Sequence, residues 1–92
     1  MDFNELIKLP WKELCKELFA NCNEMLSLEI IDYLREKYTG VQLAQIYIKL
    51  YNDYRYLIDK DDKRLLSYRM DDLWYSADEE TLFIWEKKLN DK

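Results

Sequence analysis

The sequence predicts an all-α fold, a compact bundle of four to six short amphipathic helices in a single domain over residues 1–92. The chain has only one glycine and one proline, whereas an all-β fold needs many turns. Apolar residues recur every three or four positions in several segments, which is the helical period. Aromatic residues make up 15% of the chain and supply the large side chains that a small core needs.

The N-terminal part predicts two helices separated by Pro10. Asp2 and Glu5 have the spacing of a capping box, so a short helix is expected over residues 3–8. Pro10 ends that helix and suits the first turn of the next one. The apolar stripe of the second helix comprises Trp11, Leu14, Cys15, Leu18, Phe19 and Cys22.

A third helix is expected after a break between residues 21 and 27, where Asn21, Asn23 and Ser27 are typical capping residues. Gly40 is expected to close this helix in the left-handed conformation that glycine adopts readily. The apolar stripe between the break and Gly40 comprises Ile30, Ile31, Leu34 and Tyr38.

Residues 43–58 predict a central helix on which the other helices pack. A β-hairpin over residues 46–58 is the alternative, because this segment is rich in β-branched and aromatic residues around Asn52-Asp53. The helix is favoured, since a tight hairpin turn usually has glycine where Asp53 stands. The helical stripe comprises Leu43, Ile46, Tyr47, Leu50, Tyr51, Tyr54, Leu57 and Ile58.

The C-terminal third predicts two more helices. Asp59, Asp61 and Asp62 offer N-caps for a helix over residues 62–76. Ser76 and Glu79 repeat the capping-box spacing before the last helix. The inward stripe of the fifth helix comprises Leu66, Met70, Leu73, Trp74 and Ala77, and the last helix is expected to close onto the bundle through Phe83, Ile84, Trp85 and Leu89.

The sequence contains no motif for catalysis or for a cofactor. Histidine is absent, so the commonest general base near neutral pH and the commonest metal ligand are missing. A calcium loop beginning at Asp59 would need glycine and glutamate where Arg64 and Met70 stand. Cys15 and Cys22 are too far apart on one helix for a disulfide and are expected to be buried thiols. We therefore expect no enzyme, no metal and no cofactor.

The charge of the chain favours a protein partner. Nineteen acidic and fourteen basic side chains give a net charge of −5, which disfavours nucleic acid and anionic membranes and suits a basic protein. No apolar run approaches the roughly 18 residues of a membrane span, and no secretion signal is recognisable after Met1. A cytoplasmic location is therefore expected.

The candidate partner-binding residues lie on the second face of the fifth helix and just beyond it. Tyrosines among charges are typical of protein interfaces, and residues 71–80 contain five acids and no base. The alternative is that these residues form ordinary solvated surface. The candidate residues are Arg64, Tyr68, Asp71, Asp72, Tyr75, Asp78, Glu79 and Glu80.

We interpret the chain as a small acidic interaction module, a regulator or inhibitor that docks on a basic partner such as a nuclease or another nucleic-acid-binding protein. In size, charge and aromatic content it resembles phage and mobile-element inhibitors of host nucleases, anti-CRISPR proteins among them, and small immunity proteins. The resemblance is one of composition.

Two other functions remain as alternatives. In a helix-turn-helix protein, two helices would meet at Thr39-Gly40, and Gln42 and Gln45 would be the base-reading candidates, with Lys49 as a nearby cation. Direct nucleic-acid binding is disfavoured, because the second of these helices carries few cations. In a homodimeric structural or adaptor protein, two copies would bury the surplus aromatic surface between them.

Overall fold

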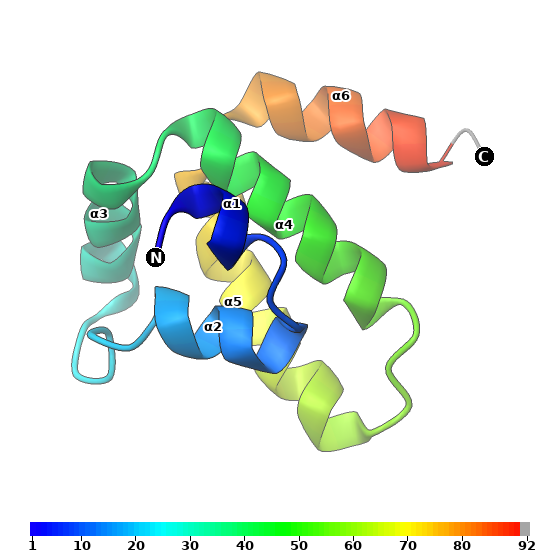
Figure 1. Cartoon of the computed structure of the whole chain (residues 1–92), viewed down its shortest axis with the longest axis horizontal. Coiled ribbons are helices and arrows are strands. Elements are labelled where there is room, and N and C mark those ends of the chain that lie inside the picture. Colours follow the sequence, from blue (N-terminus) through cyan, green and yellow to red (C-terminus); the bar gives the residue numbers. More distant parts are fainter. Residues whose placement is uncertain (91–92) are drawn as a thin grey trace.

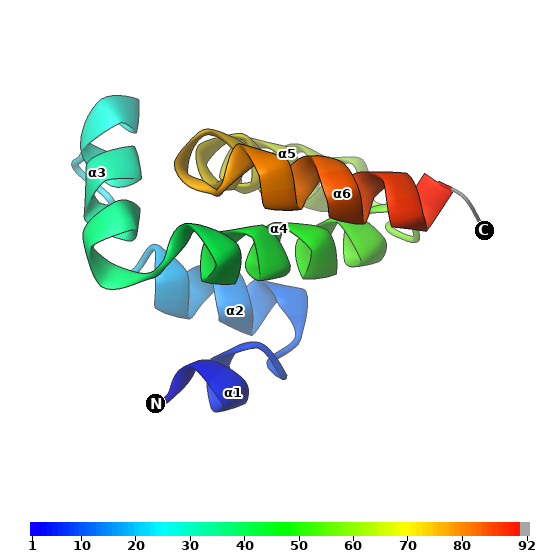
Figure 2. The same cartoon turned by 90° about the horizontal axis from the view of Figure 1, so that it is seen from above.

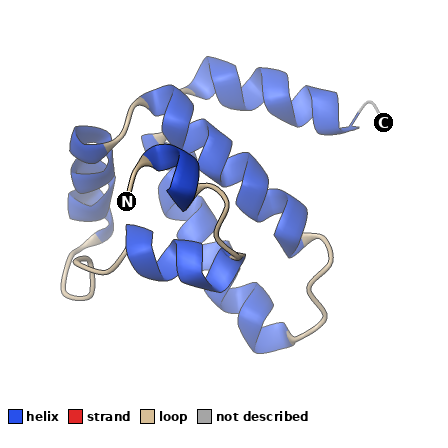
Figure 3. Ribbon diagram, in the orientation of Figure 1, coloured by secondary structure: helices blue, strands red, loops and turns tan. Residues whose placement is uncertain are grey.

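The computed structural model describes the backbone of residues 1–90 and the side chains of residues 1–87. Within this part of the chain there are helices and no strands (Figure 3), so the expected all-α fold is confirmed. The hairpin alternative is wrong, because the central segment forms one continuous helix. The helices are α1 (Phe3–Leu6), α2 (Trp11–Leu18), α3 (Ser27–Lys37), α4 (Gly40–Tyr54), α5 (Lys60–Ser76) and α6 (Glu79–Asn90).

The helix α4 is the centre of the bundle, as the sequence predicts (Figure 1). Its main contacts are with α5 and α6, and α5 also packs against α3. Seen from above, α5 and α6 lie on one side of α4 while α1 and α2 lie on the other, and α3 stands across one end (Figure 2). A core of leucines and isoleucines joins these layers, and its fully buried members are Leu14, Leu18, Leu34, Leu43, Ile46, Leu50, Leu66, Leu73 and Leu82.

The expected caps of α1 and α2 are largely confirmed, although α1 ends at Leu6 and not at residue 8. The carboxylate of Asp2 accepts a hydrogen bond from the backbone N–H of Glu5 at 2.8 Å, and α2 begins directly after Pro10. The α2 helix ends at Leu18, earlier than its apolar stripe, but Phe19 and Cys22 are still buried in the turns that follow. The stripe therefore identified core residues beyond the end of the helix.

The cap of α3 differs from expectation. None of Asn21, Asn23 and Ser27 caps it, and its N-cap is Leu26, whose N–H donates to the carboxylate of Glu29 at 3.2 Å.

The expected role of Gly40 is wrong. No residue of the described chain has a positive φ, and Gly40 is the first residue of α4. The boundary is instead made by a capping box: the hydroxyl of Thr39 accepts from the N–H of Gln42, and the Gln42 side chain accepts from the N–H of Thr39, both at 3.0 Å. Gly40 is needed for close approach, because a Cβ atom there would lie 3.0 Å from the Cβ of Asp78.

Two boundaries in the C-terminal half also differ from expectation. The α4 helix ends at Tyr54, and Ile58 is 93% exposed in the loop that follows instead of extending the apolar stripe. Ser76 does not cap α6, since its hydroxyl donates to the carbonyl of Leu73. The cap is Asp78, whose carboxylate accepts from the N–H of Thr81 at 2.9 Å. The α5 cap is as expected: the carboxylate of Asp59 accepts from the N–H of Asp62.

The α6 helix touches the bundle by one side only. Buried Leu82 and half-buried Trp85 face the bundle, whereas Phe83 is 71% and Ile84 53% exposed. The expectation that Phe83 and Ile84 close the bundle is wrong, because α6 packs mainly against α4 and leaves its outer side uncovered. The side chain of Leu89 lies outside the described residues.

Candidate functional site

Four of the expected partner-binding residues form an exposed row along α5, which we call the α5 ridge: Arg64, Tyr68, Asp71 and Tyr75. Residues three or four positions apart share a helix face, so these side chains follow one another along the outside of α5. Tyr68 is 64% exposed and Tyr75 is 65% exposed. The opposite face supplies the core residues of α5, so the ridge is not needed to hold the fold together.

Asp72 lies on the flank of the α5 ridge and is half-buried. Burial raises the pKa of the Asp72 carboxyl above its usual value; the nearby Arg69 partly offsets this rise, and the charge of Asp71 adds to it. The ionised carboxylate is therefore held where it is less stable than in water.

Replacing Asp72 with asparagine is expected to increase the free energy of unfolding at neutral pH. The folded-state pKa of Asp72 is raised, so ionisation of this group costs stability as pH rises from the unfolded-state pKa through the folded-state pKa. The gain of Asp72→Asn should therefore be present at neutral pH and vanish near pH 3, below the reference value of about 3.9. Urea titrations at both pH values measure the effect.

The matched control is Asp71→Asn, which removes the same charge from an exposed neighbour on the same helix. It is expected to change stability less, since an exposed carboxylate keeps its water. An Asp72→Asn variant that is less stable than the wild type at neutral pH would contradict the conclusion that the ionised Asp72 carboxylate destabilises the fold.

The three acids after α5 have different roles. The carboxylate of Asp78 accepts hydrogen bonds from the hydroxyl and the N–H of Thr81, and these bonds lower its pKa below the usual value. Asp78 is thus engaged in capping α6 and is less free to contact a partner. Glu79 and Glu80 are exposed in the first turn of α6, where the positive end of the helix dipole favours negative charge.

The structure adds two residues to the candidate surface that sequence reasoning missed. Phe83 and Ile84 line an open hollow of about 330 Å³ together with Glu79 and Glu80. We call these four residues the α6 edge. Their spacing, at positions i, i+1, i+4 and i+5, places them on one side of a helix. That spacing was the available signal, but apolar residues elsewhere on α6 made either side a candidate for the core.

The α5 ridge and the α6 edge are joined at a fixed corner of the fold. The guanidinium of Arg35, from α3, donates hydrogen bonds to the backbone carbonyls of Tyr75 at 2.8 Å and Ser76 at 3.4 Å. On the other side of the corner, the N–H of Asp78 donates to the carbonyl of Gly40 at 3.0 Å. Contacts from α3 and α4 therefore set the direction in which α6 leaves α5 (Figures 1 and 2).

The residues of the helix-turn-helix alternative lie in a recess. The side chain of Gln42 is engaged in the cap of α4, Gln45 is exposed and Lys49 is half-buried. They line an open hollow of about 560 Å³ whose walls include Phe3 of α1 and Trp85 of α6. A helix that reads DNA must protrude into the major groove, whereas α4 is flanked by other helices (Figure 1).

The two cysteine thiols of the core are poorly reactive. Cys15 and Cys22 are free and buried, as expected. Burial raises the pKa of the Cys15 thiol to about 11, although Arg69 opposes the rise, so this thiol stays protonated at neutral pH and is a poor nucleophile. Among the described residues, no group of three or more histidine, cysteine or acidic side chains is arranged to hold a metal ion.

No helix in the described part of the chain has both the length and the apolar character needed to cross a membrane. A scan against protein-family models, a search of curated proteins and a search of solved structures each found no match.

Proposed function

We propose that this protein acts through protein–protein contact, as a small acidic regulator or inhibitor that docks on a basic partner through the α5 ridge and the α6 edge. The observation that carries the proposal is the exposure of Tyr68, Tyr75, Phe83 and Ile84 beside Asp71, Glu79 and Glu80. Large aromatic side chains that the core does not use are the residues that dominate binding energy in protein interfaces.

The two kinds of side chain on this surface have complementary effects. Burying one large apolar side chain contributes about 1.5–3 kcal/mol, so Phe83 and the two ridge tyrosines supply the affinity. The carboxylates of Asp71, Glu79 and Glu80 attract a positively charged partner and orient it before contact. A surface of this composition selects a basic protein with apolar pockets.

The proposed mechanism is steric occlusion. A basic groove that binds phosphates can accept carboxylates in their place, and the bound inhibitor then blocks access of nucleic acid to that groove. The compositional resemblance to phage and mobile-element inhibitors, anti-CRISPR proteins among them, makes a nuclease the first partner to test. The partner is identified by affinity capture from a native-host lysate, with and without nuclease treatment, followed by mass spectrometry.

The proposal is tested by reversing three acids of the surface in one variant, Asp71→Lys with Glu79→Lys and Glu80→Lys. Affinity for the captured basic partner, measured by calorimetry, is expected to fall by about 100-fold or more, because like charges across an interface cost several kcal/mol. The competition between protein and nucleic acid for the partner should be lost in parallel. The helical circular dichroism signal should fall only slightly, by the part that comes from the first turn of α6, where Glu79 and Glu80 lie.

The matched control reverses three exposed acids on α2 and the loop after it: Glu13→Lys, Glu17→Lys and Glu24→Lys. Both triple variants carry the same change in net charge, so a simple charge effect would weaken them equally. The proposal requires that the control keep its affinity. An equal loss of affinity in both variants, or no loss of affinity in the surface variant, would show that the partner does not bind at this surface.

A further inference from the structure

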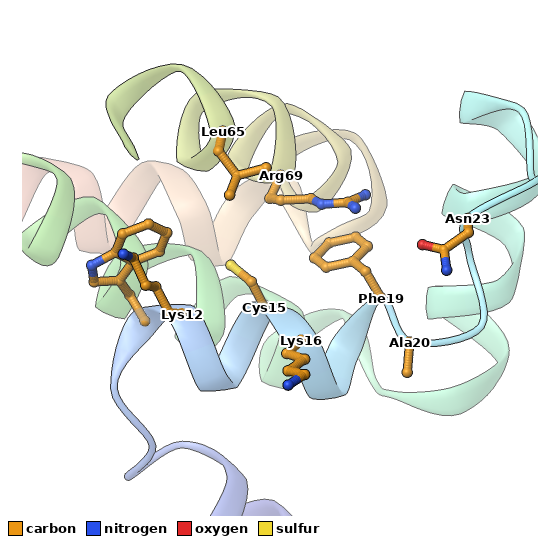
Figure 4. Close-up of a pocket in the computed structure, with 9 residues that line it drawn as sticks. Lys12, Cys15, Lys16, Phe19, Ala20, Asn23, Leu65 and Arg69 are labelled. Carbon is orange, nitrogen blue, oxygen red and sulfur yellow. The ribbon is translucent and has the colours of Figure 1, made fainter. Parts of the chain in front are cut away.

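A second feature of the surface is a groove between α2 and α5, on the side of α5 next to the ridge. It is an open hollow of about 520 Å³. Cys15 of α2 and Phe19 just after it point towards Leu65 and Arg69 of α5 (Figure 4). The guanidinium of Arg69 lies over the ring of Phe19, 4.4 Å from its centroid. The floor of this α2–α5 groove is therefore apolar and aromatic.

The charge of the α2–α5 groove is opposite to that of the whole protein. Its lining includes the cations Lys12, Lys16 and Arg69 and no acidic side chain, although the chain carries a net charge of −5. Asp62 pairs with Lys12 at 3.5 Å, but 64% of the Lys12 side chain stays exposed. A cationic rim around an apolar floor suits a segment that presents carboxylates next to large apolar side chains.

The α6 edge has that chemistry. Glu79 and Glu80 supply two carboxylates, and Phe83 and Ile84 supply two exposed apolar side chains on the same side of the helix. The groove and the edge cannot meet within one chain, because α6 and α2 lie at opposite sides of the molecule in both views, with α4 between them (Figures 1 and 2). Contact between them requires a second copy.

We propose that the α2–α5 groove is a docking site for the α6 edge of a second copy of this chain. Phe83 enters over the apolar floor, and Glu79 and Glu80 face the cations of the rim. Each copy has one groove and one edge, so two copies make two equivalent contacts when the association closes with two-fold symmetry, and an open chain when it does not. Self-association and the proposed partner would compete for the α6 edge, so dimer formation would limit the amount of protein free to act.

The test uses two charge-reversed variants of the full chain, Lys12→Glu with Lys16→Glu and Glu79→Lys with Glu80→Lys. Sedimentation velocity of the wild type, from micromolar to millimolar concentration, should show a mass that rises with concentration and falls with added salt. The self-association constant of each variant alone should be at least about tenfold lower than that of the wild type, because its groove and its edge carry the same sign of charge. An equimolar mixture should associate again, since each groove then meets an edge of opposite sign.

Two further variants keep the test decisive. Glu79→Gln with Glu80→Gln removes charge without reversing it, and is used if the lysine variant shows a reduced helical signal. Glu13→Lys with Glu17→Lys makes the same charge change as Glu79→Lys with Glu80→Lys at exposed positions outside the groove lining and should keep self-association.

Three outcomes would overturn the proposal: a wild type that stays a monomer throughout, variants that associate as the wild type does, or a mixture that does not associate. A monomeric wild type that binds a free acidic amphipathic peptide would assign the groove to a different protein. The result is separable from the proposed function, because Lys12→Glu with Lys16→Glu leaves the α5 ridge and the α6 edge intact for the basic partner.

Discussion

Replacing Leu73 with alanine is expected to lower the free energy of unfolding by about 2–5 kcal/mol, the range for truncating a fully buried leucine. Leu73 has no exposed surface and lies on α5, the helix that packs against both α3 and α4. Because a domain of this kind has a total stability of only about 5–15 kcal/mol, this loss is a large fraction of the total. Urea denaturation followed by circular dichroism measures the loss.

The control is Leu65→Ala on the same helix. Leu65 lies about two turns before Leu73 and is 49% exposed, so its truncation leaves no enclosed cavity. It should lower the free energy of unfolding by about 1 kcal/mol or less. Equal losses for the two variants would mean that the core does not lie between α5 and the other helices as described.

Replacing Gly40 with alanine is expected to destabilise the protein by about 1–3 kcal/mol, the usual cost of overpacking. Helix propensity alone predicts the opposite, since alanine is favoured over glycine inside a helix by about 0.5–1 kcal/mol. The added methyl group would lie 3.0 Å from the Cβ and 3.1 Å from the backbone nitrogen of Asp78. That nitrogen donates to the carbonyl of Gly40, so moving it away strains the bond that holds the start of α6.

Val41→Ala is the control for the Gly40 variant. Val41 is the next residue of α4 and is exposed, so its truncation should change stability by about 0.5 kcal/mol or less. Thermal unfolding of both variants by calorimetry makes the comparison. A Gly40→Ala variant that is more stable than the wild type would show that α4 and α6 do not approach each other closely.

The core could be predicted from the sequence because amphipathic periodicity states which residues are buried. Of the inward positions expected on α5, Leu66, Met70 and Leu73 are buried. The expectation for Trp74 is wrong, since it is 37% exposed, and Ala77 is half-buried at the end of the helix. Periodicity also identified Phe19 and Cys22, because the turns after α2 keep these residues on the side that faces the core. An apolar residue at every third or fourth position indicates which side chains are buried, and this indication extends a few residues beyond the end of a helix.

The corner between α5 and α6 could not be predicted, because it depends on contacts between residues far apart in sequence. Gly40 was expected to end the helix that precedes it. Glycine is instead favoured at this position because Asp78, far away in the sequence, packs closely against it. Ser76 was expected to cap α6, but it is buried and its hydroxyl donates to the carbonyl of Leu73, so that Asp78 caps the helix instead. Local capping chemistry offers several candidates, and tertiary packing chooses among them.

The candidate surface was predicted in part. The α5 ridge follows from the helical period, since tyrosines opposite a core stripe must face outward. The exposure of Phe83 and Ile84 does not follow from it, because α6 carries apolar residues on both sides and only its packing against α4 decides which side is covered. The most apolar part of the proposed interface therefore became visible only in the structure.

The most direct test of the account is a map of the surface that the partner contacts. Amide chemical shifts of the isotopically labelled 11.4 kDa chain can be followed while the captured basic partner is added. We expect the largest changes at Tyr68, Asp71 and Tyr75 on the α5 ridge and at Glu79–Ile84 around the α6 edge. Changes confined to Gln42, Gln45 and Lys49, or to a face of the protein that includes neither surface, would contradict it.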